Sequence, residues 1–242
     1  MIGAIVQARM GSTRLPGKVM LEGAGKPLLG HLLERLSYSQ HLERTIVATT
    51  TSERDNVIEE LCSSLGVLVY RGSEDDVLDR YYQAAKAFGL TTIVRVTSDC
   101  PLIDPWLIDE KIAFFKSKFS SYDLITNRHP LTYPDGIDFD LIPLHGLETA
   151  WRNAREALHR EHVVPFFWEC GLRVYNFEDP RKLFYSHRWT LDYIEDYELI
   201  KAIYSGLYKD HSKFATDDIL KYLSAHPELS QINAKYLPSQ QL

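Results

Sequence analysis

The sequence lacks the features that mark membrane, secreted and nucleic-acid-binding proteins. No apolar run approaches 18 residues, so no segment is expected to span a bilayer. The first ten residues, MIGAIVQARM, contain neither a charged leader nor a small-residue cleavage site, so no signal peptide is expected. The net charge is -6 and there is no basic run, which argues against partners such as nucleic acid or an anionic membrane.

Cysteine is scarce. Cys62, Cys100 and Cys170 are odd in number and widely spaced, and no two of them form a C-x-x-C pair. This pattern favours free thiols in a reducing compartment over a disulfide framework or a zinc site. We therefore expect a cytoplasmic protein.

What the sequence does contain is regular alternation of strand and helix patterns. Its 242 residues, 45% hydrophobic, are sufficient for one α/β domain covering 1–242. Apolar or β-branched runs predict strands at 2–8, 45–50, 67–71 and 91–99. Helical spacing predicts helices at 28–36, 53–65, 74–88 and 106–119, with Ser52, Ser73 and Asp104 as their candidate N-terminal caps. This order predicts βαβ units on a parallel sheet.

The pattern changes after residue 126. The segment 127–187 is rich in proline, histidine and aromatic residues, and we expect it to form an excursion from the sheet with a helix at 146–158. Short strands are expected at 122–126 and 172–177. Two helical segments, 194–208 and 216–226, are expected to close the fold.

The most informative stretch is the loop after the first strand, QARMGSTRLPGKVML, residues 7–21. It does not match a Walker A loop, because five residues separate Gly11 from Gly17 and Val19 follows Lys18 where a hydroxyl is required. The spacing of the glycines after it does not match a dinucleotide-binding G-x-G-x-x-G turn either.

The cations in this loop predict a phosphate clamp made by side chains. Arg9, Arg14 and Lys18 can neutralise phosphate charge, and the hydroxyl of Ser12 can donate a hydrogen bond. The loop leaves the carboxyl end of a strand, where open α/β sheets bind ligands. The alternative is a solvated surface loop without a specific ligand.

The run A-R-x-x-S-T-R-L-P-G-K resembles the signature loop of the sugar-acid cytidylyltransferases, a family that includes CMP-Kdo and CMP-sialic acid synthetases and the homologues of spore coat polysaccharide biosynthesis protein F. Weaker matches occur at 45–50, 71–82, 95–105, 134–140 and 188–198. The resemblance implies a Rossmann-like nucleotidyltransferase sheet, mostly parallel, α/β/α and GT-A-like, with a small inserted arm. It also implies that CTP and an acidic sugar react to give a CMP-sugar and pyrophosphate.

The resemblance assigns roles to individual residues. It places Arg9, Arg14, Lys18 and Asp99 at the catalytic centre, and Ala8, Gly11, Ser12, Arg71, Gly72, Ser73 and Arg80 with Arg9 and Lys18 around the nucleotide. It makes Asp99 and Asp192 the carboxylate ligands of Mg²⁺, which usually takes one or two carboxylates. The sequence departs from the family pattern at Thr97 and at Tyr193-Ile194. These differences concern the contacts with the nucleotide more than the binding of the metal. By local pattern alone, Asp99 is a strand terminator, Asp192 a helix cap, and Arg80 an i−4 partner of Asp76.

The acceptor end is expected in the second half of the chain. A sugar acid carries a carboxylate, so Arg160 or Arg188 is a chemically suitable partner. We assign Asp138, Glu161 and His162 to the same end, with a structural role for His162 as the alternative. The segment 127–187 is also where the resemblance implies sugar binding and homodimer contacts.

Three other functions remain open from the sequence. Asp138-Phe139-Asp140 matches the Asp-x-Asp metal motif of nucleotide-sugar glycosyltransferases. A non-catalytic nucleotide-binding homologue would retain the same fold. A uridylyltransferase or guanylyltransferase would differ only in the nucleotide used.

Overall fold

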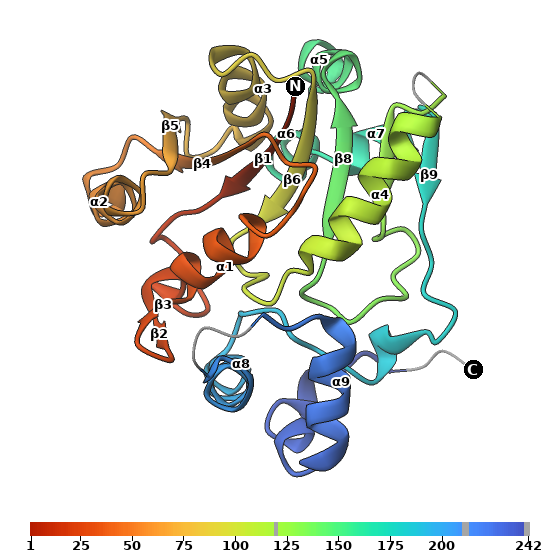
Figure 1. Ribbon diagram of the computed structural model, residues 1–242. Helices are drawn as coiled ribbons and strands as arrows, with labels where there is room; N and C mark the ends of the chain where they lie inside the picture. Colours follow the sequence, from red (N-terminus) through yellow and green to blue (C-terminus); the bar gives the residue numbers. More distant parts are fainter. Residues whose placement is uncertain (119–120, 210–212, 240–242) are drawn as a thin grey trace.

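The computed structural model describes residues 1–118, 121–209 and 213–239. At its centre is a seven-stranded sheet with the order β5-β4-β1-β6-β8-β7-β9 (Figure 1). Its strands are β1 (Ile2–Gln7), β4 (Arg44–Thr50), β5 (Leu68–Gly72), β6 (Thr92–Thr97), β7 (Leu124–Thr126), β8 (Phe139–Pro143) and β9 (Val174–Asn176). A separate two-stranded ribbon pairs β2 (Glu22–Gly23) with β3 (Lys26–Pro27).

The sheet is mostly parallel, as expected. Strand β1 pairs in parallel with β4 and β6, and β4 pairs in parallel with β5. Strand β8 runs antiparallel to both of its neighbours, β6 and β7, while β7 and β9 are parallel. The carboxyl ends of β1, β4 and β6 therefore lie at one edge of the sheet, next to each other.

Helices cover both faces of this sheet. They are α1 (Leu28–Leu36), α2 (Asn56–Ser64), α3 (Val77–Ala87), α4 (Pro105–Ser117), α5 (Leu144–Asn153), α6 (Ala157–His162), α7 (Pro165–Glu169), α8 (Ile194–Leu207) and α9 (Thr216–Ala225). Short 3-10 helices are η1 (Lys18–Met20), η2 (Glu53–Asp55), η3 (Leu183–Tyr185), η5 (Leu229–Gln231) and η6 (Ala234–Tyr236). The last residue of the expected helix 106–119 lies outside the described residues.

The two helical layers have separate apolar cores. Helices α1, α2 and α4 pack on one face of the sheet around Leu32, Ile58 and Ile112, and α3, α5 and α7 pack on the other face around residues such as Tyr81 and Leu147 (Figure 1). Successive residues of a strand point to opposite faces, which is why each core draws on alternate positions of β1. The arrangement is the expected α/β/α sandwich.

A third core holds the end of the chain against the sheet edge. Helices α8 and α9 pack through Ile200, Ile203 and Ile219 together with the buried Trp189 and Leu191 (Figure 1). The backbone N–H of Leu191 donates to the carbonyl of Asp99 over 2.8 Å. This hydrogen bond brings the segment before α8 to the carboxyl end of β6.

Several predicted elements differ from those observed. The segment 127–187 supplies β8 and β9 to the sheet, so it is not only an excursion from it. The helix expected at 146–158 is α5, which ends at Asn153 and is followed by α6. Helix α3 begins after Asp76, whose carboxylate accepts from the N–H of Asp79, so Ser73 is not its cap.

None of the helices in the described part of the chain is long and apolar enough to cross a bilayer. The three cysteines are free thiols, as expected: Cys62 and Cys100 are buried, and Cys170 is exposed.

Candidate active site

A cavity of about 610 Å³ opens where the loop after β1, the turn after β6 and the segment before α8 meet. This is the carboxyl edge of the parallel strands, where α/β sheets bind ligands. The sequence-predicted residues that line it are Ala8, Arg9, Ser12, Arg14, Lys18, Arg80, Asp99, Asp138, Glu161, His162 and Asp192. The loop and the two metal-site candidates therefore share one cavity.

Lys18 connects the two predicted metal ligands. Its ammonium group lies 3.3 Å from Oδ2 of Asp99 and 3.0 Å from Oδ1 of Asp192, and it donates to the carbonyl of Leu191 over 2.6 Å. The side chain is almost completely buried, since Lys18 is 9% exposed. Because one nitrogen contacts both carboxylates, the two acids face the same small volume.

Arg14 approaches the same acid from the solvent side. A guanidinium nitrogen lies 2.7 Å from Oδ1 of Asp192, and the guanidinium lies over the ring of Tyr193. Burial alone raises the pKa of Asp192, but Lys18 and Arg14 together hold this pKa below its ordinary value. A guanidinium nitrogen of Arg9, another lining residue, is 3.6 Å from Glu74. The three cations of the loop therefore line the cavity together with the ionised Asp192.

Arg188 was predicted to bind the sugar carboxylate, but it lies behind the acids. Its guanidinium is 2.8 Å from Asp135, 3.3 Å from Asp192 and 3.1 Å from Asp196, and it is not among the residues that line the cavity. Asp196 also accepts from the backbone N–H of Asp192. Arg188 thus orients carboxylates and has little capacity left for a ligand.

Three residues predicted to receive the base, together with Gly11, do not line the cavity. Arg71 donates to the carbonyls of Thr50 and Ser52, so it braces the strand ends. Gly72 and Ser73, like Arg71, are not among the residues that line the cavity. Gly11 lies against Arg54, whose Nη2 would be 2.5 Å from a Cβ placed there.

Arg80 does line the cavity, and the predicted ion pair with Asp76 does not form. Its Nη1 donates to the carbonyl of Ser73 over 2.7 Å. Asp76 instead binds Arg160, whose Nε donates to it over 2.9 Å and whose Nη1 donates to the carbonyl of Trp151. Arg160 therefore ties α6 to α3 and is not directed at a sugar carboxylate.

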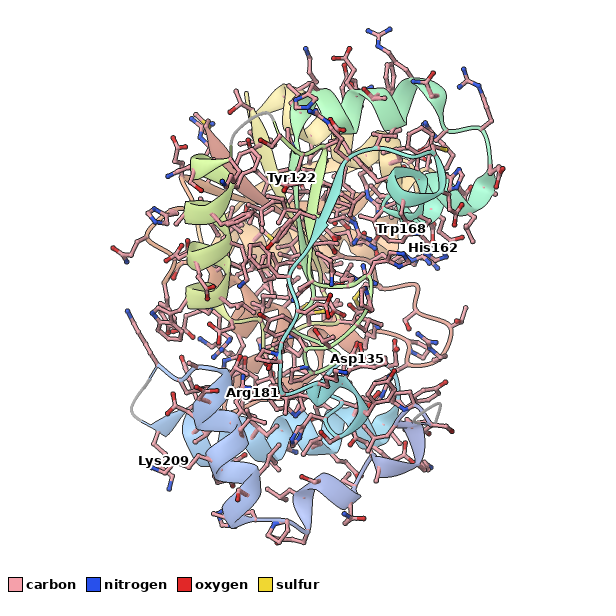
Figure 2. All side chains as sticks on the ribbon, turned by 90° about the vertical axis from the view of Figure 1, so that its right-hand side faces the viewer. Tyr122, Asp135, His162, Trp168, Arg181 and Lys209 are labelled. Atoms are coloured by element: carbon pink, nitrogen blue, oxygen red, sulfur yellow. The ribbon has the colours of Figure 1, made fainter. Side chains whose placement is uncertain are left out.

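Helix α6 divides its polar side chains between two directions. His159 is buried and bonds to Glu169 over 2.7 Å, whereas Glu161 and His162 line the cavity. Figure 2 shows His162 close to Trp168, another lining residue, with Asp135 below them. The structural alternative for His162 is therefore not favoured by its position.

The lining residues that sequence reasoning missed include Arg128, Asp135 and Trp168. The signal for Asp135 was the turn sequence Pro-Asp-Gly. Gly136 has a φ of +108°, and a Cβ there would come within 2.3 Å of the backbone N of Thr190. Only glycine allows this close approach, which places Asp135 beside the segment that carries Asp192.

The comparisons with known proteins show the family of this chain. The family model described as Cytidylyltransferase matches residues 3–223. The chain belongs to the cytidylyltransferase family. The family and the nucleotidyltransferase class implied by the loop are therefore confirmed.

Individual relatives of this cytidylyltransferase cover nearly its whole length. The spore coat polysaccharide biosynthesis protein SpsF of Bacillus subtilis is 33% identical, over 93% of this chain and 94% of the relative. The 3-deoxy-manno-octulosonate cytidylyltransferase of Trichlorobacter lovleyi is 35% identical, over 85% and 87%. A solved cytidylyltransferase structure from Leptospira borgpetersenii superimposes with a TM-score of 0.90 at 35% identity, covering 95% of this chain and 96% of the other.

The Asp-x-Asp alternative does not suit the structure of this cytidylyltransferase. Asp140 is completely buried, 2.9 Å from Nη1 of Arg95 and 2.6 Å from the hydroxyl of Thr126. Asp138, just before the start of β8, lines the cavity. The two acids of the motif therefore have different surroundings. Asp140 is not available as a metal ligand, because Arg95 and Thr126 already bind its carboxylate.

The residues at the base of the cavity suit a magnesium ion. In the described part of the chain no group of three or more histidine, cysteine or acidic residues gathers around a metal position. Mg²⁺ does not require one, because it usually takes one or two carboxylates and completes its shell with water and phosphate oxygens. Asp99 and Asp192 meeting at one nitrogen are such a pair of oxygen ligands.

Proposed function

We propose that this cytidylyltransferase joins CTP to a sugar acid, giving a CMP-sugar and pyrophosphate. The observation that carries the proposal is Lys18 held between Asp99 and Asp192 at the base of a cavity lined by Arg9 and Arg14. Cations opposite paired carboxylates suit a triphosphate with its metal. The name of the Trichlorobacter lovleyi relative, a 3-deoxy-manno-octulosonate cytidylyltransferase, supports an acidic sugar as the acceptor.

The chemistry requires positioning and charge neutralisation. The sugar hydroxyl attacks the α-phosphorus in line: a new O–P bond forms, the bond to pyrophosphate breaks, and the proton of the hydroxyl is released to water. Lys18 and Arg14 neutralise charge on the transferred and leaving phosphates, and Arg9 lines the same cavity. Mg²⁺, when bound by Asp99 and Asp192, supplies further charge neutralisation.

The proposal also covers the setting of the enzyme. Three free thiols suit the cytoplasm, where CTP is available. The name of the Bacillus subtilis relative supports a role in making a surface polysaccharide, such as that of a spore coat. A homodimer with contacts in 127–187 completes the proposal, and light scattering after size-exclusion chromatography tests it: a monomeric mass contradicts the dimer.

Pyrophosphate release tests the activity. The protein is incubated with Mg²⁺, one nucleoside triphosphate and a panel of sugars, including 3-deoxy-manno-octulosonate and N-acetylneuraminate. We expect release with CTP and an acidic sugar, and its loss on chelation of the metal. Release with UTP or GTP in place of CTP contradicts the choice of nucleotide. Release only with neutral sugar phosphates contradicts the acidic acceptor.

A further inference from the structure

Arg128 presents an unused guanidinium to the cavity. The residue follows β7 and lines the cavity near Asp99 and Asp138. Its nearest ion-pair contact is Oδ2 of Asp140 at 3.9 Å, and that carboxylate already binds Arg95 and Thr126. In the described part of the chain the guanidinium makes no hydrogen bond. A planar fork of donors therefore remains free for a ligand.

Asp138 presents the complementary group. It is 8% exposed and lines the cavity, and its Oδ1 atom is buried without a hydrogen-bond partner in the described structure. A buried carboxylate oxygen without a donor is costly, so a ligand that donates to it gains binding energy. The structure thus leaves an unpaired donor group and an unpaired acceptor in one cavity.

Asn127 fixes the relative position of these two residues. Its side chain donates to the carbonyl of Ile137 over 3.2 Å and accepts from the N–H of Phe139 over 3.1 Å, on either side of Asp138. Asn127 is completely buried and directly precedes Arg128. The two cavity-lining residues are therefore held on adjoining, hydrogen-bonded segments.

The electrostatics agree with this placement. Burial raises the pKa of Asp138 to about 7; Arg128 opposes the shift, while Asp135, Asp140 and Asp99 add to it. The pKa of Arg128 is raised in spite of its burial, mainly by Asp138. The charge of each of these two side chains shifts the pKa of the other, although they form no ion pair within 4 Å. The charge of Asp99 shifts the pKa of both.

We propose that Arg128 binds the carboxylate of the sugar acid and that the Oδ1 atom of Asp138 accepts a hydrogen bond from its attacking hydroxyl. The inference rests on the proposed function and deepens it. In the ring form of a 2-keto sugar acid, the carboxylate and the anomeric hydroxyl are attached to the same carbon. A guanidinium and a carboxylate oxygen that line the same cavity match that pair of groups, and the influence of Asp99 on both directs the hydroxyl toward the α-phosphate.

The test compares Arg128→Gln with wild type on a charged and a neutral acceptor. Pyrophosphate release is measured with saturating CTP and either 3-deoxy-manno-octulosonate or its carboxamide, and CTP binding is measured by calorimetry. We expect Arg128→Gln to raise KM for the acid about 10- to 100-fold and to leave CTP binding unchanged. The preference for acid over amide falls by the same factor. Arg155→Ala, which removes an exposed arginine outside the cavity, is the matched control and keeps wild-type values.

Two further variants keep the test decisive. Arg128→Lys retains the charge without the fork and is expected to recover part of the acid preference, which also covers the case in which Arg128→Gln does not fold. Asp138→Asn is expected to lower kcat/KM for the acid about 10-fold or more with CTP binding unchanged.

The failures of the two proposals are distinguishable. If the wild type turns over the acid and Arg128→Gln keeps the full preference for acid over amide, the assignment of Arg128 is overturned while the proposed function stands. An unchanged kcat/KM in Asp138→Asn overturns the second contact. If the wild type releases no pyrophosphate with any acid, the proposed function and this inference fall together.

Discussion

The ammonium group of Lys18 lies 3.0 Å from Oδ1 of Asp192, a residue 174 positions later in the chain. The contact joins the cationic loop after β1 to the start of helix α8. The buried ammonium group of Lys18 also lies next to Asp99 and Asp192, the two carboxylates proposed to bind the metal that accompanies the triphosphate. The contact closes the loop against the segment that precedes α8.

Lys18→Met is expected to abolish most of the activity at a moderate cost in stability. The variant loses a cation at the phosphates, which we expect to lower kcat about 100- to 1,000-fold. Asp192 keeps Arg14 and Arg188 as partners, so the free energy of unfolding falls by about 1–3 kcal/mol. Pyrophosphate release and urea unfolding measure the two effects, with Lys116→Met on the surface as the control. Near-wild-type turnover in Lys18→Met means that Lys18 has no catalytic role.

Asp138 and Asp140 are expected to respond oppositely to the same substitution. Asp140→Asn breaks the fully buried pair with Arg95 and is expected to cost about 3 kcal/mol of unfolding free energy. Asp138→Asn removes no ion pair and is expected to fold normally with reduced turnover. Chemical denaturation and kinetics on both variants test this contrast. If Asp140→Asn is stable but inactive and loses metal dependence, the Asp-x-Asp mechanism is restored.

The sequence predicted the parts of the site that depend on local pattern. Asp99 is the last residue of the predicted strand 91–99, and Asp192 lies just before the predicted helix 194–208, so both could be placed at an element end. The cations of the loop were predictable for the same reason, because strand β1 fixes where the loop begins. Strands β7 and β9 were also predicted from short apolar runs.

The residues that the sequence misassigned depend on partners far away in the chain. Arg160 looked free for a sugar, but its partner Asp76 lies 84 positions earlier. Arg71 is likewise bound by backbone carbonyls at the end of another strand. Arg128 was missed because only the pairing of β7 with β8 shows that the neighbouring carboxylate of Asp140 is already occupied. The hydrophobic periodicity of a segment shows which face of its helix or strand a residue occupies. It does not show which charged side chain or carbonyl that residue binds in the folded protein.

Gly136→Ala is expected to disrupt the site by displacing its backbone. A Cβ at this position would meet backbone atoms of Trp189 and Thr190 at 2.3 Å, and the φ of +108° is unfavourable for alanine. We expect a loss of more than about 2 kcal/mol in the free energy of unfolding together with loss of turnover. Gly25→Ala is the control: its φ is +87° but no atom lies within 4 Å, so only about 1 kcal/mol is expected. Equal losses in the two variants would contradict a role for the close approach.

Asp138 is expected to make stability fall with rising pH. Burial raises its pKa from 3.8 to about 7, with Arg128 opposing and Asp135, Asp140 and Asp99 adding to the shift. Between these two values the folded protein holds a proton on Asp138 that the unfolded chain has released. Stability from this group is therefore fully present below about pH 3.8, declines as pH rises toward 7, and stays constant above it.

Asp138→Asn removes this dependence, because an amide does not titrate. The difference in unfolding free energy between variant and wild type should shift in favour of the variant from pH 4.5 to about pH 7 and then remain constant. Urea unfolding at half-unit steps of pH measures the difference, and any constant offset from the substitution itself cancels from the slope. Asp75→Asn, at an exposed position, serves as the control for the loss of one negative charge. A difference that does not change across this range would mean that Asp138 is ionised in the folded protein and that the free oxygen in the cavity belongs to a permanently charged group.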